Sequence, residues 1–171
     1  KAGHPIFFTI TNPSILFSGV GTESKYNTLE LLTNDLKPQS LLIKKNTKPK
    51  TVSVLIDLHQ LSYPIIAKPD VGFRGYLVKK IDSEASLLRY LDHVNEDLIL
   101  QEFIPHENEF GIFYHRIPGH KNGKITSVTI KKFIKIKGDG MLTVSQLIKN
   151  DARAFLYTDL FFNLHRDKLN K

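Results

Sequence analysis

The chain of 171 residues contains no cysteine, and it lacks any apolar run near the roughly 18 residues that a membrane-spanning helix needs. Without cysteine, disulfides and thiolate metal sites are excluded. The opening segment "KAGHPIFFTITNP" has a short apolar patch but no long hydrophobic region and no small-residue cleavage site, so it predicts no signal peptide. We therefore expect a cytoplasmic protein with no membrane partner.

The remaining composition is that of an ordinary soluble protein, with 41% hydrophobic and 24% charged residues. The length is sufficient for one large or two small domains with a sizeable core. The net charge of +7, from 24 basic and 17 acidic residues, would suit a polyanionic partner such as nucleic acid, a membrane surface or nucleotide phosphates. The lysine pairs that begin at positions 44, 79 and 131 are scattered, however, so solvated surface lysines remain an open alternative.

The first part of the chain predicts short elements separated by breakers. Residues 1–24 look irregular because Pro, Gly and Ser interrupt them. Leucines at helical spacing predict a helix over residues 25–36, and Pro38 ends it because the residue before a proline is pushed out of the α region. After the short strand "SLLI", residues 51–61 are ambiguous: their β-branched residues favour a strand, but their apolar side chains share one helical face. We favour a helix there.

The segment "YPIIAKPDVGFRGYLVKKI", residues 63–81, predicts a hairpin. Its first strand, "PIIAKP", stops at Pro69, and "GYLVKKI" is the expected partner. The stretch "DSEASLLRYLDHV" then predicts a helix with Asp82 or Ser83 as its cap. The continuous apolar run in "DLILQEF" is typical of a buried strand.

The second part of the chain predicts a further hairpin. Residues 109–117 and 124–136 read as strands around the turn "PGHKNGK", in which Asn122-Gly123 is a hairpin signal. Residues 138–164 predict a glycine-rich turn and one or two helices. This mixed order of strands and helices predicts an α+β fold rather than a doubly wound parallel sheet.

Lys68 is the first candidate functional residue. A lysine late in an apolar strand can bury its stem while its ammonium reaches a cleft. Gly72 and Gly75 in the following loop permit positive φ and a close approach of backbone N–H groups to phosphate oxygens. The loop lacks the Gly-Lys-Ser/Thr ending of a Walker A motif. Taken alone, this segment favours an ordinary hairpin over a phosphate site.

The segment "LILQEFIPHENEF" is the second candidate. An extended hinge after a buried strand can offer backbone groups to an adenine edge, and a later carboxylate can accept protons from two ribose hydroxyls. A solvated acidic loop between two strands remains the open alternative for this segment.

The combination of these segments, in this order, resembles the central part of the ATP-grasp superfamily, in particular its D-alanine–D-alanine ligase-like and carboxylate–amine ligase branches. The stretch "IKGDGMLTVSQLI" adds to the resemblance, which covers residues 20–160. It implies an ATP-grasp clamp of antiparallel sheets with packed helices, incomplete at both ends. The expected organisation is an N-terminal segment (1–50), a small subdomain with the phosphate-binding hairpin (51–105) and the truncated start of a second subdomain (106–171).

The resemblance also implies roles for individual residues. Lys68 would hold the α- and β-phosphates, and the loop from Gly72 to Gly75 would fold over the triphosphate as a lid. Glu102 would meet the adenine amino group, with Phe103 beside it, and Ile104 would present its backbone at the hinge.

Three further residues complete the implied site. Glu109 would bind the ribose, and Lys25 resembles a second lysine that contacts the nucleotide. Arg74 lies in the lid, where it would reach the γ-phosphate or a substrate carboxylate, or alternatively face solvent as a turn residue.

The implied chemistry is the ATP-dependent activation of a small-molecule carboxylate as an acyl phosphate, followed by its joining to an amine. This chemistry uses magnesium, which oxygen ligands hold. The sequence after Gly140 lacks the family's acidic residue followed by Glu-x-Asn, so we expect the metal ligands outside this chain. We expect the chain to be a piece of a longer ligase that is inactive alone.

Three alternatives remain open: another ATP-grasp chemistry (a carboxylate–thiol ligase or a carboxylase subunit), a nucleotide-binding module without catalysis, and a basic nucleic-acid-binding domain. Phe73 and Tyr76 could stack on nucleic-acid bases, but no RNA-binding signature accompanies them, and we do not expect this partner. His115 and His120 lack a third ligand, so we interpret them as surface histidines and predict no metal site.

Overall fold

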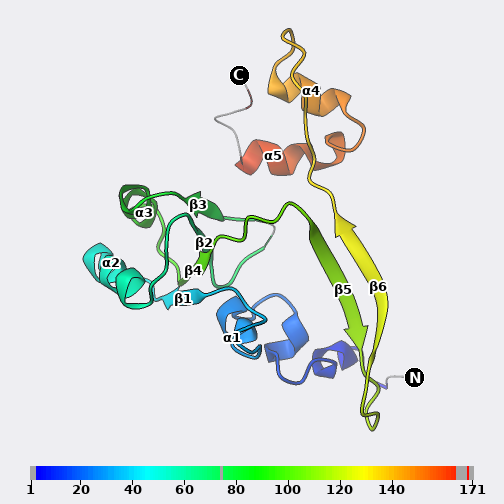
Figure 1. Ribbon diagram of the computed structural model, residues 1–171. Helices are drawn as coiled ribbons and strands as arrows, with labels where there is room; N and C mark the ends of the chain where they lie inside the picture. The colour runs from blue at the N-terminus through cyan, green and yellow to red at the C-terminus, as the bar shows by residue number, and fades with distance from the viewer. Residues whose placement is uncertain (1–2, 74, 165–168, 170–171) are drawn as a thin grey trace. The chain divides into compact units, whose positions relative to one another are not determined.

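The computed structural model describes residues 3–73, 75–164 and 169. The chain divides into two compact units, Lys1–Pro105 and His106–Lys171, each of which is described by itself (Figure 1). Both units combine helices with an antiparallel sheet, so the predicted α+β class is confirmed. Along the described residues, no helix is both long and apolar enough to cross a membrane.

The first unit is built on a four-stranded sheet with the order β1-β4-β2-β3. Its strands are β1 (Ser40–Ile43), β2 (Ile65–Pro69), β3 (Lys79–Ile81) and β4 (Leu98–Glu102). Each neighbouring pair is antiparallel, and β4 lies between β1 and β2. The predicted hairpin of residues 63–81 corresponds to β2 and β3.

Helices cover one face of this sheet. The helices α2 (Pro49–Leu58) and α3 (Glu84–Leu91) lie on the same side of it (Figure 1). The core between them consists of alternate strand residues, inward helix residues and one residue of the loop after α2, namely Leu41, Ile43, Val52, Ile56, Leu61, Ile65, Ala67, Ile81, Leu87, Tyr90, Leu98 and Leu100. Alternate strand side chains point to opposite faces, so the residues between these core positions face away from α2 and α3.

The ambiguous residues 51–61 are helical up to Leu58, as favoured. Val52 and Ile56, one turn apart in α2, are both buried against the sheet, and Pro49 occupies the first turn, where its missing N–H costs nothing. In α3, Ser83 is the cap and forms a capping box with Ser86. Both helices are stabilised because each buries a stripe of apolar side chains against the sheet.

The predicted helix over residues 25–36 is much shorter in the structure. The helix α1 (Lys25–Leu29) ends after five residues, and turns with three-residue spacing follow it. Leu36 is 69% exposed, and Leu32 is exposed as well. Because these leucines stay largely exposed, their burial does not offset the cost of ordering further helical turns.

The predicted strand over residues 75–81 is also shorter, because β3 begins at Lys79. Gly75 has φ +79° and Leu77 has φ +54°, which are left-handed conformations that a strand does not contain. The residues before Lys79 therefore form turns instead.

The second unit contains a two-stranded hairpin, β5 (Glu109–His115) and β6 (Lys124–Lys131), whose residues are all exposed. Cross-strand partners share a face, so the register places six apolar side chains on one face: Phe110, Ile112, Tyr114, Ile125, Val128 and Ile130. Opposite Phe113 and Tyr114, β6 carries one extra residue, Thr126, and this register shift brings Ile125 onto the same face as Tyr114.

The tight turn of this hairpin differs from the predicted one. The N–H of His120 donates to the carbonyl of Ile117 (3.1 Å) across Pro118-Gly119, and Gly119 has φ +86°. Proline followed by glycine with positive φ suits the two central positions of a β-turn. Gly123 is not part of this turn. It allows the chain there to pass close to β5, because a side chain at this position would collide with the carbonyl of His115.

The helices α4 (Val144–Asn150) and α5 (Thr158–Leu164) follow in the second unit, so the predicted helical ending is confirmed. Thr143 caps α4 in a capping box with Gln146. A small core of Ile148, Ala154 and Leu169 gathers partly buried side chains around it. The strand predicted over residues 124–136 ends at Lys131, and Ile134 and Ile136 pack on this core.

Candidate functional site

Lys68 lies near the end of β2, on the sheet face opposite α2 and α3. Its Nζ donates a hydrogen bond to Oε1 of Gln101 in β4 (2.8 Å). Burial lowers the pKa of the Lys68 ammonium, and the nearby charge of Lys25 lowers it further. A charged donor is thus held in a partly desolvated place, where an anion would bind it more strongly than in water.

Gln101 is oriented by a short chain of hydrogen bonds. Its Nε2 donates to Oγ of Ser40 (2.9 Å), which in turn donates to the carbonyl of Pro38 (3.0 Å). Because the amide nitrogen is engaged in this way, its oxygen is directed at Lys68. Sequence reasoning overlooked Gln101 in favour of the adjacent Glu102, although strand periodicity places Gln101 on the same face as Lys68.

Lys25 begins α1 and shares a pocket with Lys68. The pocket has a volume of about 290 Å³. Its lining residues are Ile15, Gly19, Glu23, Lys25, Thr28, Leu29 and Lys68. The structure therefore brings together the two lysines singled out in the sequence, with apolar and polar side chains around them.

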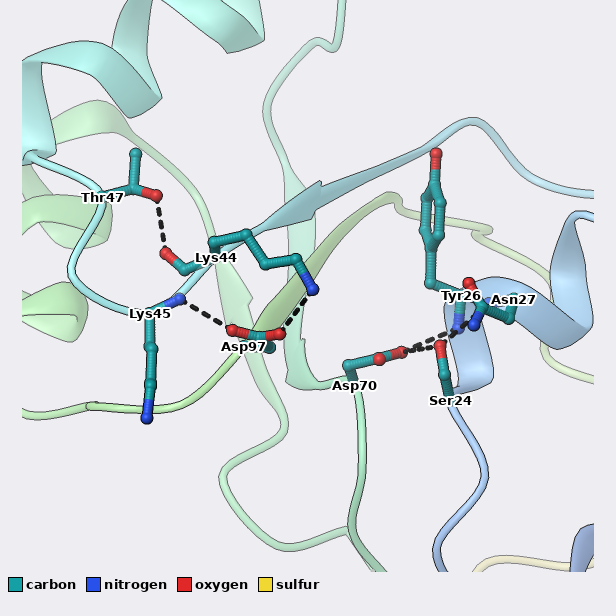
Figure 2. A network of polar contacts seen from close by, with 8 residues as sticks. All are labelled: Ser24, Tyr26, Asn27, Lys44, Lys45, Thr47, Asp70 and Asp97. Atoms are coloured by element: carbon teal, nitrogen blue, oxygen red, sulfur yellow. Dashed lines mark hydrogen bonds and ion pairs between the residues drawn. The ribbon is translucent and has the colours of Figure 1, made fainter. Parts of the chain in front are cut away.

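Asp70, which sequence reasoning did not identify, links the two lysine-bearing segments. It directly follows β2, and its Oδ1 accepts hydrogen bonds from the hydroxyl of Ser24 (3.0 Å) and the N–H of Tyr26 (2.8 Å) (Figure 2). The carbonyl oxygen of Asp70 accepts from Nζ of Lys25 (3.0 Å). An aspartate after a strand-ending proline is a weak signal in a sequence, because its partners lie far away along the chain.

A second aspartate fixes the neighbouring end of the sheet. The carbonyl of Asp97 accepts from the N–H of Asp70 (2.9 Å). Its carboxylate accepts from Nζ of Lys44 and the N–H of Lys45, both at 2.8 Å (Figure 2). These bonds, first the one from Lys44, lower the pKa of the Asp97 carboxyl. The two aspartates therefore hold the ends of β1, β2 and β4 together.

The glycine loop after β2 has the backbone conformations that only glycine adopts easily. Gly72 has φ +153° and Gly75 has φ +79°. The ring of Phe73 lies against the N-terminal segment, where a Cβ on Gly21 would come within 3.2 Å of it. Arg74, the predicted lid residue, lies outside the described residues.

Glu102 lies on the other side of β4 from Gln101. Its Oε2 accepts from the N–H of Gln39 (3.3 Å), and it lines a second pocket of about 390 Å³ rather than the lysine pocket. Phe103 lies under Nζ of Lys80, 4.7 Å from the ring centroid, and Ile104 is 45% exposed. The structure thus does not bring the Glu102 carboxylate beside Lys68.

Glu109 belongs to the second unit. Its carboxylate forms an ion pair with Nζ of Lys131 (2.8 Å) across the hairpin. His115 ends β5, and His120 lies in the loop after it. Among the residues that the structure describes, no group of three or more His, Asp or Glu side chains could hold a metal ion.

Comparisons with known proteins find similarity among solved structures. No family model and no curated protein sequence matches the chain. Among solved structures, the chain is similar to the D-alanine-D-alanine ligase from Helicobacter pylori, with 20% sequence identity and a TM-score of 0.47. The match covers 85% of this chain and 48% of the ligase chain, so the chain spans about half the length of that structure. Because the identity and the TM-score are low, any function of this chain must be argued from the lysine pocket.

The pocket is suited to binding an anion. Both of its ammonium groups are held by neutral oxygens, the amide of Gln101 and the carbonyl of Asp70. Neither ammonium forms an ion pair with a carboxylate in the described part of the chain. Glu23 brings one negative charge to the lining, so the two lysines leave an excess of positive charge.

Proposed function

We propose that this chain is the ATP-binding portion of an ATP-dependent ligase of the ATP-grasp superfamily, of the carboxylate–amine type. The observation that carries the proposal is the pocket shared by Lys25 and Lys68, which come from segments far apart in the sequence. Two convergent ammonium groups match the adjacent negative charges of a polyphosphate, and charge-assisted hydrogen bonds are the strongest of their kind.

The surroundings of the two lysines support a nucleotide rather than free phosphate. Ile15 and Leu29 give the pocket apolar walls, and small-molecule sites are commonly apolar with a few placed polar groups. In this proposal Lys68 and Lys25 bind the phosphates, and the loop from Gly72 to Gly75 closes over them with backbone N–H groups.

The remaining site residues are proposed by resemblance. Glu102, Phe103 and the backbone of Ile104 would form the adenine hinge, Glu109 would bind the ribose, and Arg74 would act in the lid. ATP, when bound, supplies the γ-phosphoryl group that converts a substrate carboxylate into an acyl phosphate, from which an amine displaces phosphate. The residues of this chain position and neutralise the phosphates, which is where most of the catalytic effect arises in phosphoryl transfer.

The described residues do not contain a group of ligands suited to magnesium. No cluster of acidic or histidine side chains there has the number of oxygen or nitrogen ligands that the ion needs. We propose that the ligands of this ion lie outside this chain.

Titration calorimetry with ATP tests the proposal. The wild-type chain should bind ATP, and Lys68→Ala should weaken binding about ten- to a hundred-fold, since a hydrogen bond to a charged group contributes about 1.5–3 kcal/mol. Lys50→Ala, which removes the same charge from an exposed position in α2, should leave the affinity unchanged. The proposal would be overturned if the wild-type chain did not bind ATP but bound nucleic acid with an affinity that falls steeply as the salt concentration rises.

A further inference from the structure

Asp70 is a charged residue in a place where charges are costly. It is only 6% exposed, and a carboxylate removed from water must be compensated by hydrogen bonds or opposite charges. Here the compensation comes from the segment that begins α1, through the hydroxyl of Ser24 and the N–H of Tyr26. The buried charge is therefore satisfied by the residues on either side of Lys25.

The helix that carries Lys25 is short and only partly buried. It has five residues, of which Asn27 is exposed and the other four are half-buried. Isolated helices this short are not stable in water, so contacts with the rest of the unit must hold α1, and the hydrogen bonds to Asp70 are among them. Ser24 caps the helix by accepting from the N–H of Asn27 (3.0 Å) while it donates to Asp70. The same hydroxyl thus starts the helix and attaches it to the sheet.

Asp70 is itself fixed to the sheet. Its N–H donates to the carbonyl of Asp97, just before β4, and it directly follows Pro69 at the end of β2. Its carbonyl accepts from both the N–H (3.2 Å) and Nζ (3.0 Å) of Lys25. Through this one aspartate, the end of β2 forms hydrogen bonds with three consecutive residues, 24 to 26. Figure 2 shows the bonds from Ser24 and Tyr26.

We propose that Asp70 is a positioning residue of the nucleotide site: its buried carboxylate anchors the start of α1 and so holds the Lys25 ammonium beside Lys68. This inference rests on the proposed function in one respect, namely that the two lysines bind phosphate together. Like charges repel, so the two ammonium groups would separate without an anchor. Asp70 keeps them together before the ligand arrives, which reduces the cost of ordering them on binding.

Two variants separate an anchoring role from a general structural role in the free protein. Asp70→Ala should increase hydrogen exchange of the backbone amides of residues 24–29 at least ten-fold, while exchange in β4 stays unchanged. Asp97→Asn provides a matched control, because it changes a carboxylate of the same network that holds residues 44 and 45 instead. It should increase exchange there and leave residues 24–29 protected.

A double-mutant cycle on ATP affinity tests the connection to Lys25. Asp70→Ala should weaken ATP binding about ten-fold in the wild-type background and cause no further loss in the Lys25→Ala background, because Asp70 acts through Lys25. Ser24→Ala, which leaves the carboxylate in place but removes one of its donors, should give a smaller loss in the same direction. If Asp70→Ala does not fold, Asp70→Asn or Ser24→Ala can replace it and be combined with Lys25→Ala in the same double-mutant cycle.

The outcomes are distinguishable. Unchanged exchange over residues 24–29 in Asp70→Ala, or equal losses of ATP affinity with and without Lys25, would overturn the anchoring role. A wild-type chain that does not bind ATP would overturn the proposed function, and the exchange measurement would still decide whether Asp70 anchors α1.

Discussion

The two antiparallel sheets of this chain differ in how their apolar residues are covered. In the first unit, Leu98 and Leu100 of the central strand β4 are buried on the face that helices cover, and Ile99 is buried on the opposite face. In the second unit, β5 and β6 are similarly apolar on one face, yet every residue is exposed. Apolar composition alone therefore does not predict burial. A second layer is needed, and an uncovered two-stranded sheet is marginally stable in water.

The largest expected difference between the two sheets is the loss of stability when an isoleucine is truncated to alanine in each of them. Ile65→Ala in β2 removes a side chain that is 0% exposed, and it should lower the free energy of unfolding by about 2–5 kcal/mol. Ile112→Ala in β5 removes a side chain that is 54% exposed, and it should change stability by less than about 0.5 kcal/mol. Urea unfolding followed by circular dichroism measures both. Equal losses would contradict the contrast between the sheets.

A smaller effect should appear only at alkaline pH, and it belongs to the covered sheet. Burial, together with Glu96 and Tyr76, raises the pKa of Tyr90 from 10.0 to about 12. The unfolded chain therefore loses this proton at lower pH than the folded one, so the stabilisation is complete below about pH 10 and is lost as the pH rises to about 12.

Tyr90→Phe tests this pH dependence by comparison with the wild type. The variant loses the hydrogen bond from the Tyr90 hydroxyl to the carbonyl of Leu77 (2.7 Å), which should cost about 0.5–1.5 kcal/mol below pH 10. The difference in stability between the wild type and Tyr90→Phe should become smaller as the pH rises from about 10 to about 12. Urea unfolding midpoints of both proteins, measured across this range, give this difference. A gap that stays constant up to pH 12 would rule out the raised pKa.

The smallest effect concerns the ion pair on the hairpin. Glu109 and Lys131 are 55% and 53% exposed, and exposed pairs contribute between nothing and about 1 kcal/mol. Lys131→Ala should therefore barely change the unfolding midpoint, and any change should disappear at high salt. Lys124→Ala, at the other end of β6, controls for the loss of one positive charge. A large and salt-independent loss in Lys131→Ala alone would show that the pair is more than a surface contact.

The elements that could be predicted are those with strong local patterns. The capped leucine stripe of α3 and the apolar run of β4 are visible within a few residues, and both are confirmed. The predicted helix over residues 25–36 was wrong beyond Leu29, because helical spacing says nothing about whether Leu32 and Leu36 meet an apolar partner.

The candidate site was visible only in part for a similar reason. Lys68 and the glycine loop form a local pattern, but the hydrogen bonds that orient them join distant segments. Asp70 is 46 residues away from its partner Ser24, and Gln101 is 33 residues away from Lys68. The choice between Gln101 and Glu102 depends on which face of β4 each occupies, and this is decided by the pairing of β4 with β2.

The sheet order also has a consequence for the sequence of events during synthesis. β1 and β2 are not paired with each other, because β4 lies between them. β2 and β3 can form their hairpin as soon as both have left the ribosome, since the chain between them is short. β1 must wait for β4, its neighbour in the sheet, until the chain has been made through Glu102. The strand that is made first is therefore among the last to be paired, and this long-range closure should limit the folding rate of the first unit.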